Sequence, residues 1–127
     1  MMQRDFEDLI VWQKSHKLAL QIYEITKDFP KEELYGLTSQ IRRASSSIPM
    51  NIAEGTGLKS YADFRRLLAM ARGSLMELRY QLRLCKDLGY INADTYFRFV
   101  RDYDEVGKML NGLITSLECA INNKPKK

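Results

Sequence analysis

The spacing of apolar residues constrains the fold of this chain more than any other feature of its sequence. Apolar residues recur in alternating steps of four and three from Phe64 to Cys85, and again from Tyr96 to Leu117. Because an α-helix turns once in about 3.6 residues, these steps place the apolar side chains on one face. Both segments therefore predict helices with one buried side. The predicted buried positions are Phe64, Leu68, Ala71, Leu75, Leu78, Leu82 and Cys85, and Tyr96, Phe99, Tyr103, Val106, Leu110, Leu113, Leu117 and Ile121.

Two earlier segments have helical periodicity as well, and Pro30 separates them. No segment alternates with period two for long enough to form a strand, and short connections favour antiparallel neighbours. We therefore predict an all-α, antiparallel up-down-up-down four-helix bundle. It forms a single domain over residues 1–127, with a disordered basic tail at 123–127. The predicted buried positions of the first two helices are Val11, Ser15, Leu18, Ile22, Ile25 and Phe29, and Leu37, Ile41, Ala44, Ile48 and Ile52.

The residues at the segment ends support these boundaries. Ser60 and Asp63 match the start of a capped helix, with Asp in place of the preferred Glu. Gly89 follows the third segment, where helices commonly end in a left-handed residue. Either Asn92 or Asp94 can cap the fourth segment.

Pro49 interrupts the pattern of the second helix. A proline inside a helix lacks one hydrogen-bond donor and clashes with the preceding turn, which costs about 3 kcal/mol. Either the helix kinks there, or two short helices meet and Ser46 or Ser47 caps the second one. Two roles are open for the proline: it serves the local structure alone, or it bends the helix and thereby shapes a binding surface.

The composition is that of a soluble globular protein, with 45% apolar and 28% charged residues. No apolar run reaches the roughly 18 residues needed to span a bilayer, and Met1 to Asp5 show no signal-peptide pattern. We expect a cytoplasmic protein with no membrane partner. Cys85 and Cys119 are expected to lie about 30 Å apart on antiparallel helices, as two free thiols.

The charge is concentrated in the middle of the chain. The net charge is +4, but residues 42–86 hold nine Lys and Arg against three acidic residues. Arg65, Arg72, Arg79 and Lys86 recur every seven residues beside the apolar positions of the third helix.

Two interpretations of this basic stripe remain open. The side chains can pair with acidic residues of neighbouring helices, for which the candidates are Glu24, Asp28, Asp94, Asp102, Asp104 and Glu105. Alternatively, they can follow the phosphates of RNA or DNA. The candidate nucleic-acid-binding residues are Arg42, Arg43, Arg65, Arg66, Arg72, Arg79, Arg83 and Lys86.

The residues needed for most enzyme chemistry are missing. His16 is the only histidine, and the two cysteines lack the spacing of a zinc site. Gly55 to Ser60 superficially resembles a phosphate loop but lacks its spacing and does not follow a strand. Asn51 and Glu54 lie three residues apart and are expected to form structural hydrogen bonds. We predict no catalytic residue, no metal, no cofactor and no enzyme activity.

Several strings together resemble one known family. They are Phe6-Glu7-Asp8-Leu9, Val11-Trp12-Gln13-Lys14, Leu37-Thr38-Ser39-Gln40-Ile41-Arg42-Arg43-Ala44, Ser47-Ile48-Pro49-Met50-Asn51-Ile52-Ala53-Glu54-Gly55, and Lys86-Asp87-Leu88-Gly89-Tyr90-Ile91. The chain resembles the four-helix-bundle proteins encoded in 23S rRNA intervening sequences. Pro49, Asn51, Glu54 and Gly55 belong to its most specific string. Thr56 and Leu58 depart from the aromatic and basic residues that the resemblance leads us to expect there.

The resemblance implies a ring-like homo-oligomer, such as a pentamer. Bundles of this kind also resemble the accessory protein of diversity-generating retroelements, which works with a reverse transcriptase and engages nucleic acid through a basic surface. The leading hypothesis is a non-enzymatic oligomer that binds RNA or DNA phosphates as an accessory factor. The alternative is a protein-interaction scaffold, in which the basic middle helices mediate ring assembly or bind a partner protein such as a reverse transcriptase. In that model, Trp12, Ala19 and Tyr23 form a second apolar flank that assembly buries.

Overall fold

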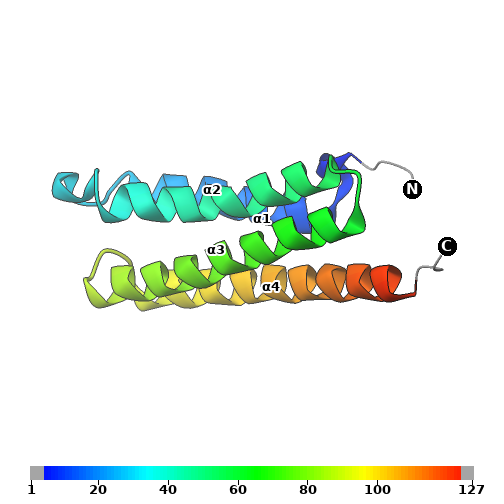
Figure 1. Ribbon diagram of the computed structural model, residues 1–127. Coiled ribbons are helices and arrows are strands. Elements are labelled where there is room, and N and C mark those ends of the chain that lie inside the picture. The colour runs from blue at the N-terminus through cyan, green and yellow to red at the C-terminus, as the bar shows by residue number, and fades with distance from the viewer. Residues whose placement is uncertain (1–4, 124–127) are drawn as a thin grey trace.

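Four α-helices make up most of the molecule, as Figure 1 shows. The computed structural model describes residues 5–123. The helices are α1 (Ile10–Thr26), α2 (Leu37–Thr56), α3 (Tyr61–Asp87) and α4 (Ala93–Asn122). Two short 3-10 helices, η1 (Phe6–Asp8) and η2 (Lys31–Glu33), precede α1 and α2. Residues 5–123 contain no strand, so the predicted all-α fold is confirmed.

The helices form an antiparallel square. Helix α2 packs against α1 and α3, and α4 packs against α3 and α1, while α1 and α3 lie diagonally opposite each other. Pairs of contacts show the directions. Ser47 and Gly55 of α2 meet Ser74 and Phe64 of α3, and Arg65 and Arg79 of α3 meet Glu118 and Asp104 of α4, so the order reverses in each case. The long α3 and α4 run side by side along the lower edge of Figure 1.

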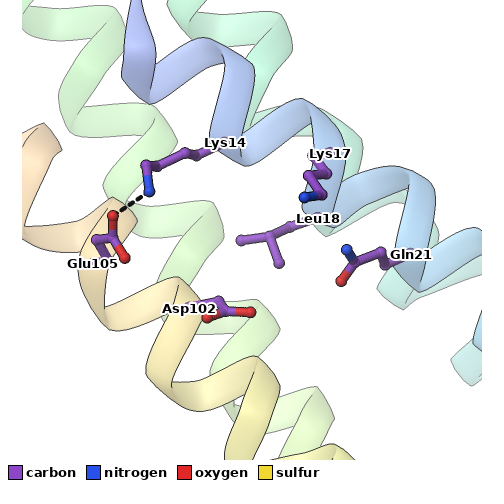
Figure 2. Close-up of a pocket in the computed structure, with 6 residues that line it drawn as sticks. All are labelled: Lys14, Lys17, Leu18, Gln21, Asp102 and Glu105. Atoms are coloured by element: carbon purple, nitrogen blue, oxygen red, sulfur yellow. Dashed lines mark hydrogen bonds and ion pairs between the residues drawn. The ribbon is translucent and has the colours of Figure 1, made fainter.

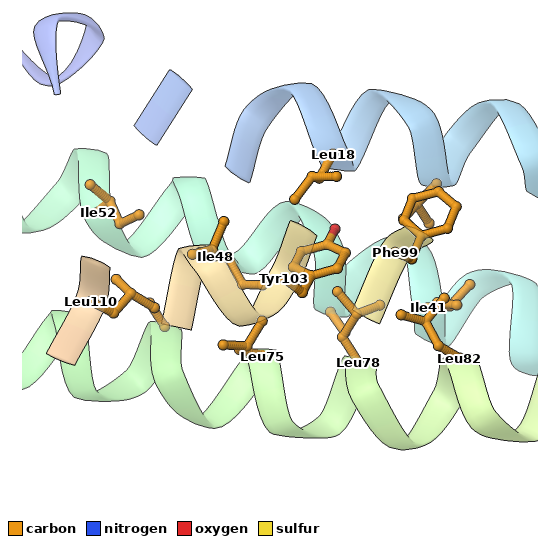
Figure 3. Packing of buried hydrophobic residues seen from close by; sticks show 14 of the residues in the cluster. Leu18, Ile41, Ile48, Ile52, Leu75, Leu78, Leu82, Phe99, Tyr103 and Leu110 are labelled. Carbon is orange, nitrogen blue, oxygen red and sulfur yellow. The ribbon is translucent and has the colours of Figure 1, made fainter. Parts of the chain in front are cut away.

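The core consists of the apolar faces that the periodicity predicts. Figure 3 shows side chains of all four helices meeting between the ribbons. The α2 face is buried at every predicted position, and the α3 face at every one except the half-buried Phe64. Burial on this scale contributes roughly 25 cal/mol for each Å² of apolar surface removed from water. Among the largest completely buried residues are Phe99, Tyr103, Leu78, Leu82 and Ile48.

The helix ends follow the predicted capping chemistry. The Ser60 hydroxyl accepts a hydrogen bond from the Asp63 amide at 3.0 Å, and Asn92 accepts one from the Thr95 amide at 2.8 Å. Gly89 has a φ of +79°, and the following Tyr90 amide donates to the Cys85 carbonyl at 2.9 Å. This left-handed glycine closes α3 and turns the chain towards α4.

Helix α2 continues through Pro49, so the alternative of two short helices is wrong. The hydroxyl of Ser45 donates to the Arg42 carbonyl at 3.0 Å, and that of Ser46 donates to the Arg43 carbonyl at 3.2 Å. Neither bond reaches the Ser45 carbonyl, which is the one that loses its amide donor at Pro49. Pro49 itself is buried, and packing on one face compensates for the missing amide donor.

Three predicted features differ in detail. Helix α1 ends at Thr26, and Phe29 reaches the core from the following turn. In α4 the innermost residue after Leu110 is Ile114, while Tyr96, Leu113, Leu117 and Ile121 are only half-buried, as is Ile25 in α1. A straight helix drifts about 20° per heptad from a seven-residue repeat, which rotates Ile114 inward. Of the tail expected to be disordered, Asn123 caps α4 and residues 124–127 lie outside the described residues.

The two cysteines are free, as predicted, with Cys85 buried and Cys119 exposed. Burial raises the pKa of the Cys85 thiol to about 12. Within residues 5–123, no helix combines the length and the apolar character that crossing a membrane requires.

Candidate nucleic-acid interface

The basic stripe of α3 runs along α4 in a regular ladder. Arg65 lies 3.8 Å from Glu118, Arg72 donates to the Asn111 side chain at 3.1 Å, and Arg79 lies 2.9 Å from Asp104. Each step of seven residues along α3 is matched by a step of seven in the opposite direction along α4. Two antiparallel helices with the same apolar repeat keep their flanking positions in register.

This ladder leaves Arg72 without charge compensation. Glu118 and Asp104 neutralise Arg65 and Arg79, whereas Asn111 offers Arg72 only a neutral amide oxygen. Within residues 5–123, no carboxylate lies within ion-pair distance of Arg72. Pairing between helices therefore explains part of the basic stripe and not the rest.

The remaining α3 cations lie near carboxylates of their own helix. Arg83 donates to both carboxylate oxygens of Asp87, and this hydrogen bond raises the pKa of the guanidinium. Lys86 lies 3.8 Å from Asp87 and 5.5 Å from the centre of the Tyr96 ring. Arg66 is exposed and lies 4.0 Å from Asp63. Exposed pairs of this kind contribute about 0–1 kcal/mol and leave the side chains free to rearrange.

A groove of about 530 Å³ lies between α3 and α4 at the centre of the ladder. Two glycines line it. The space beside Gly73 is open, since an added Cβ would meet nothing within 4 Å, whereas Gly107 packs closely on α3, since its Cβ would lie 3.0 Å from Leu75. Lys108 lies at its edge, and no acidic group of the described chain pairs with it. We call this feature the α3–α4 groove. Its lining residues are Ala69, Arg72, Gly73, Leu75, Met76, Arg79, Asp104, Gly107, Lys108 and Asn111.

Arg42 does not lie on this surface. Its guanidinium donates to the Thr26 hydroxyl at 2.7 Å and to the Tyr23 carbonyl at 3.3 Å, and it lies 5.0 Å from the centre of the Tyr23 ring. Arg42 thereby binds the carbonyl end of α1, where a cation is favourable. Arg42 therefore lies between α1 and α2, on the opposite side of the square from the ladder between α3 and α4. Arg43 is exposed on α2.

The remaining residues of the predicted motif connect α2 to its neighbours. The Asn51 amide donates to the Ser47 carbonyl at 2.8 Å and to the Ser47 hydroxyl at 3.0 Å, and that hydroxyl lies 2.9 Å from the hydroxyl of Ser74 on α3. A Cβ on Gly55 would lie 2.7 Å from the Phe64 ring. Asn51 itself bonds only within α2, and Ser47 carries the contact on to α3. The Glu54 side chain is exposed and forms no hydrogen bond or ion pair within residues 5–123, so the structural hydrogen bond predicted for it is not found.

A second surface, between α1 and α2, is apolar. Leu20 is 58% exposed and Met50 is 63% exposed, and neither was singled out from the sequence because both lie outside the core repeat. Trp12 stacks on His16 at 4.8 Å. We call this feature the α1–α2 apolar surface. Around its hollow of about 340 Å³ lie Phe6, Trp12, His16, Ala19, Leu20, Tyr23, Ser46, Pro49, Met50 and Ala53.

A third hollow, of about 180 Å³, lies between α1 and α4, and Figure 2 shows that both signs of charge surround it. Lys14 pairs with Glu105 across it, beside Leu18. Lys17 and Asp102 line the same hollow, so positively and negatively charged side chains surround it together. Within residues 5–123, no group of three His, Cys, Asp or Glu side chains could hold a metal ion.

Comparisons with known proteins agree with this architecture. Residues 7–112 match the family model described as 23S rRNA-intervening sequence protein. A crystal structure of a protein with unknown function, from the S23 ribosomal protein family of Bacteroides thetaiotaomicron, superposes with a TM-score of 0.78 at 31% sequence identity. The match covers 84% of this chain and 96% of that one. No curated protein matches the chain. The chain belongs to the 23S rRNA-intervening sequence protein family.

Proposed function

We propose that this protein is a non-enzymatic, cytoplasmic accessory factor that binds the phosphates of RNA or DNA through the α3–α4 groove. Arg72, Arg79 and Lys108 line the groove and are the central contacts, and Arg65, Arg66, Arg83 and Lys86 extend them along α3. Binding of this kind depends on charge and not on base sequence.

One observation carries the proposal: Arg72 and Lys108 both line the groove, and neither has an acidic partner within residues 5–123. The groove has a volume of about 530 Å³, and the space beside Gly73 is open. Arginine supplies a planar fork of donors suited to phosphate oxygens.

Charge reversal tests the proposal. Arg72→Glu with Lys108→Glu should weaken binding to a labelled RNA of about 12 nucleotides by a factor of about 100 or more, since at least two phosphate contacts are replaced by repulsion. The matched control is Lys31→Glu on the exposed η2, which changes charge far from the groove and should leave binding within about twofold. Equal effects of the two changes would refute the assignment to the groove.

The α1–α2 apolar surface favours a second role, self-association into a ring such as a pentamer or capture of a partner protein. Exposed apolar patches on soluble proteins commonly mark interfaces. Arg65 and Arg79 already have carboxylate partners in their own subunit, which favours apolar over ionic assembly. Leu20→Glu with Met50→Glu should then reduce the mass measured by light scattering to that of one chain. The scaffold alternative instead predicts that reversing Arg65 and Arg79 breaks the ring.

A further inference from the structure

Two exposed aromatic rings lie on the helices that form the α3–α4 groove. Phe97 is 61% exposed and Tyr80 is 66% exposed, although most aromatic residues of α4 face the core or its edge. Exposed rings next to uncompensated cations supply the two kinds of group that an unpaired nucleic-acid strand uses, a stacking face and a phosphate partner.

Phe97 is continuous with the groove. It lines a second hollow on α4 together with Arg101, and Asp104 and Lys108 line both hollows. In the register of the ladder, Phe97 occupies the position opposite Lys86. The neighbouring Tyr96 ring packs edge-on against it at 5.2 Å, which restricts its motion and leaves its other side exposed.

Tyr80 continues the same surface on α3. It follows Arg79 directly and lies one turn from the exposed Met76, which lines the groove. Phe97 of α4 lies at the same height along the bundle as Lys86 of α3. Lys86 is six residues beyond Tyr80, which separates the two rings by roughly 9 Å along the helix axis. In the same register Arg101 lies between the levels of the two rings, and Arg79, Lys108 and Arg72 follow one another beyond Tyr80. The rings and these cations therefore form one strip along α3 and α4.

We propose that the α3–α4 groove binds an unpaired strand, with bases stacked on Phe97 and Tyr80 and phosphates held by Arg72, Arg79, Arg101 and Lys108. This inference rests on the proposed function and adds the class of nucleic acid. A duplex keeps its bases stacked inside and offers only phosphates to such a strip, whereas a single strand offers both. Every base has a face that can stack, so no sequence preference is required.

The test compares three probes of equal length, about 12 nucleotides: a single-stranded RNA, its duplex, and a single strand whose bases have been removed at alternate positions. The wild-type protein should bind the intact single strand at least about tenfold more tightly than the other two at the same salt concentration. Phe97→Leu with Tyr80→Leu should abolish this preference and leave duplex binding unchanged. The matched control is Tyr35→Leu, since Tyr35 is 93% exposed outside the groove.

The outcomes separate this inference from the function on which it rests. Equal binding of all three probes, lost on reversal of Arg72 and Lys108, would overturn the stacking inference and keep the phosphate-binding function. Failure to bind any probe would overturn both. The abasic probe reports on stacking without any substitution, so it decides the question even if a leucine variant folds poorly.

Discussion

Single side chains in this bundle show how residues of one type acquire different roles. Arg42 and Arg43 are adjacent, yet Arg42 reaches Thr26 and Tyr23 on α1 while Arg43 points into solvent. The difference is one of helical phase, because successive residues are rotated by about 100°. Arg42 therefore belongs with the contacts that hold α1 against α2.

Arg42→Ala should lower the free energy of unfolding by about 1–2 kcal/mol, because two hydrogen bonds and the contact with the Tyr23 ring are lost. Arg43→Ala removes the same charge from an exposed site and should change stability by less than about 0.5 kcal/mol. Urea unfolding followed by circular dichroism measures both values. Equal destabilisation by the two changes would contradict the role assigned to Arg42.

Tyr103→Phe should stabilise the protein. Tyr103 is completely buried, and its hydroxyl has no hydrogen-bond partner within residues 5–123, as its position among apolar side chains in Figure 3 suggests. Removing a buried, unpaired hydroxyl recovers about 1 kcal/mol of desolvation cost and leaves the ring contacts intact. A thermal melt should show a higher midpoint for the variant. A clear loss of stability would instead point to a hydrogen bond that the hydroxyl makes.

The free energy of unfolding should fall at alkaline pH because the thiol of Cys85 is buried in its protonated form. Burial raises the pKa of the Cys85 thiol to about 12, above its value of about 9 in the unfolded chain. The stabilising effect of the protonated thiol is therefore complete below pH 9 and is lost as pH rises towards 12. Cys85→Ala should reduce the slope of stability against pH in this range by up to about 1.4 kcal/mol per pH unit. Cys119→Ala, at an exposed thiol, should leave the slope unchanged.

At the scale of helices, the string around Pro49 is a packing device on α2. Ile48 and Ile52 face the core, Asn51 contacts α3 through Ser47, and Gly55 lets Phe64 approach the α2 backbone. These residues point in different directions around one helix, so each meets a different neighbour. The string therefore fixes how α2 lies between α1 and α3.

Gly55→Ala should be destabilising by about 1–3 kcal/mol, because the new Cβ would lie 2.7 Å from the Phe64 ring and 3.3 Å from the Leu67 Cβ. The matched control is Gly112→Ala in α4, where an added Cβ meets nothing within 4 Å. That change should be stabilising by about 1 kcal/mol, since alanine favours a helix more than glycine does. Chemical unfolding of both variants gives the comparison, and a stabilised Gly55→Ala would contradict the close approach.

Helices and their buried faces could be predicted because periodicity is a property of each segment alone. The partners of the arginines could not, since they depend on which helix lies beside which and in what register. Asp104 was among the expected partners of the basic stripe, whereas Glu118 and Asn111 were not. The packing of the bundle also determines which helix Arg42 contacts and how Ile114 is rotated towards the core, so neither could be predicted from one segment.

Viewed as a whole, the molecule has two different sides. The α1–α2 apolar surface and the α3–α4 groove lie on opposite edges of the square, as the two layers of Figure 1 indicate. Self-association through the first surface would leave the second open to solvent. The two proposed roles are therefore compatible, and a ring would present several grooves to one strand and strengthen binding through multivalency.

The most direct test of nucleic-acid binding by the α3–α4 groove is the salt dependence of affinity for a single-stranded RNA. We predict that log K falls linearly with log salt concentration, with a slope of about −0.7 for each phosphate contact. Arg72→Gln with Lys108→Gln should make that slope shallower by about 1.4, because two contacts are removed. An affinity that is independent of salt, or a slope that is the same in the variant, would contradict the account.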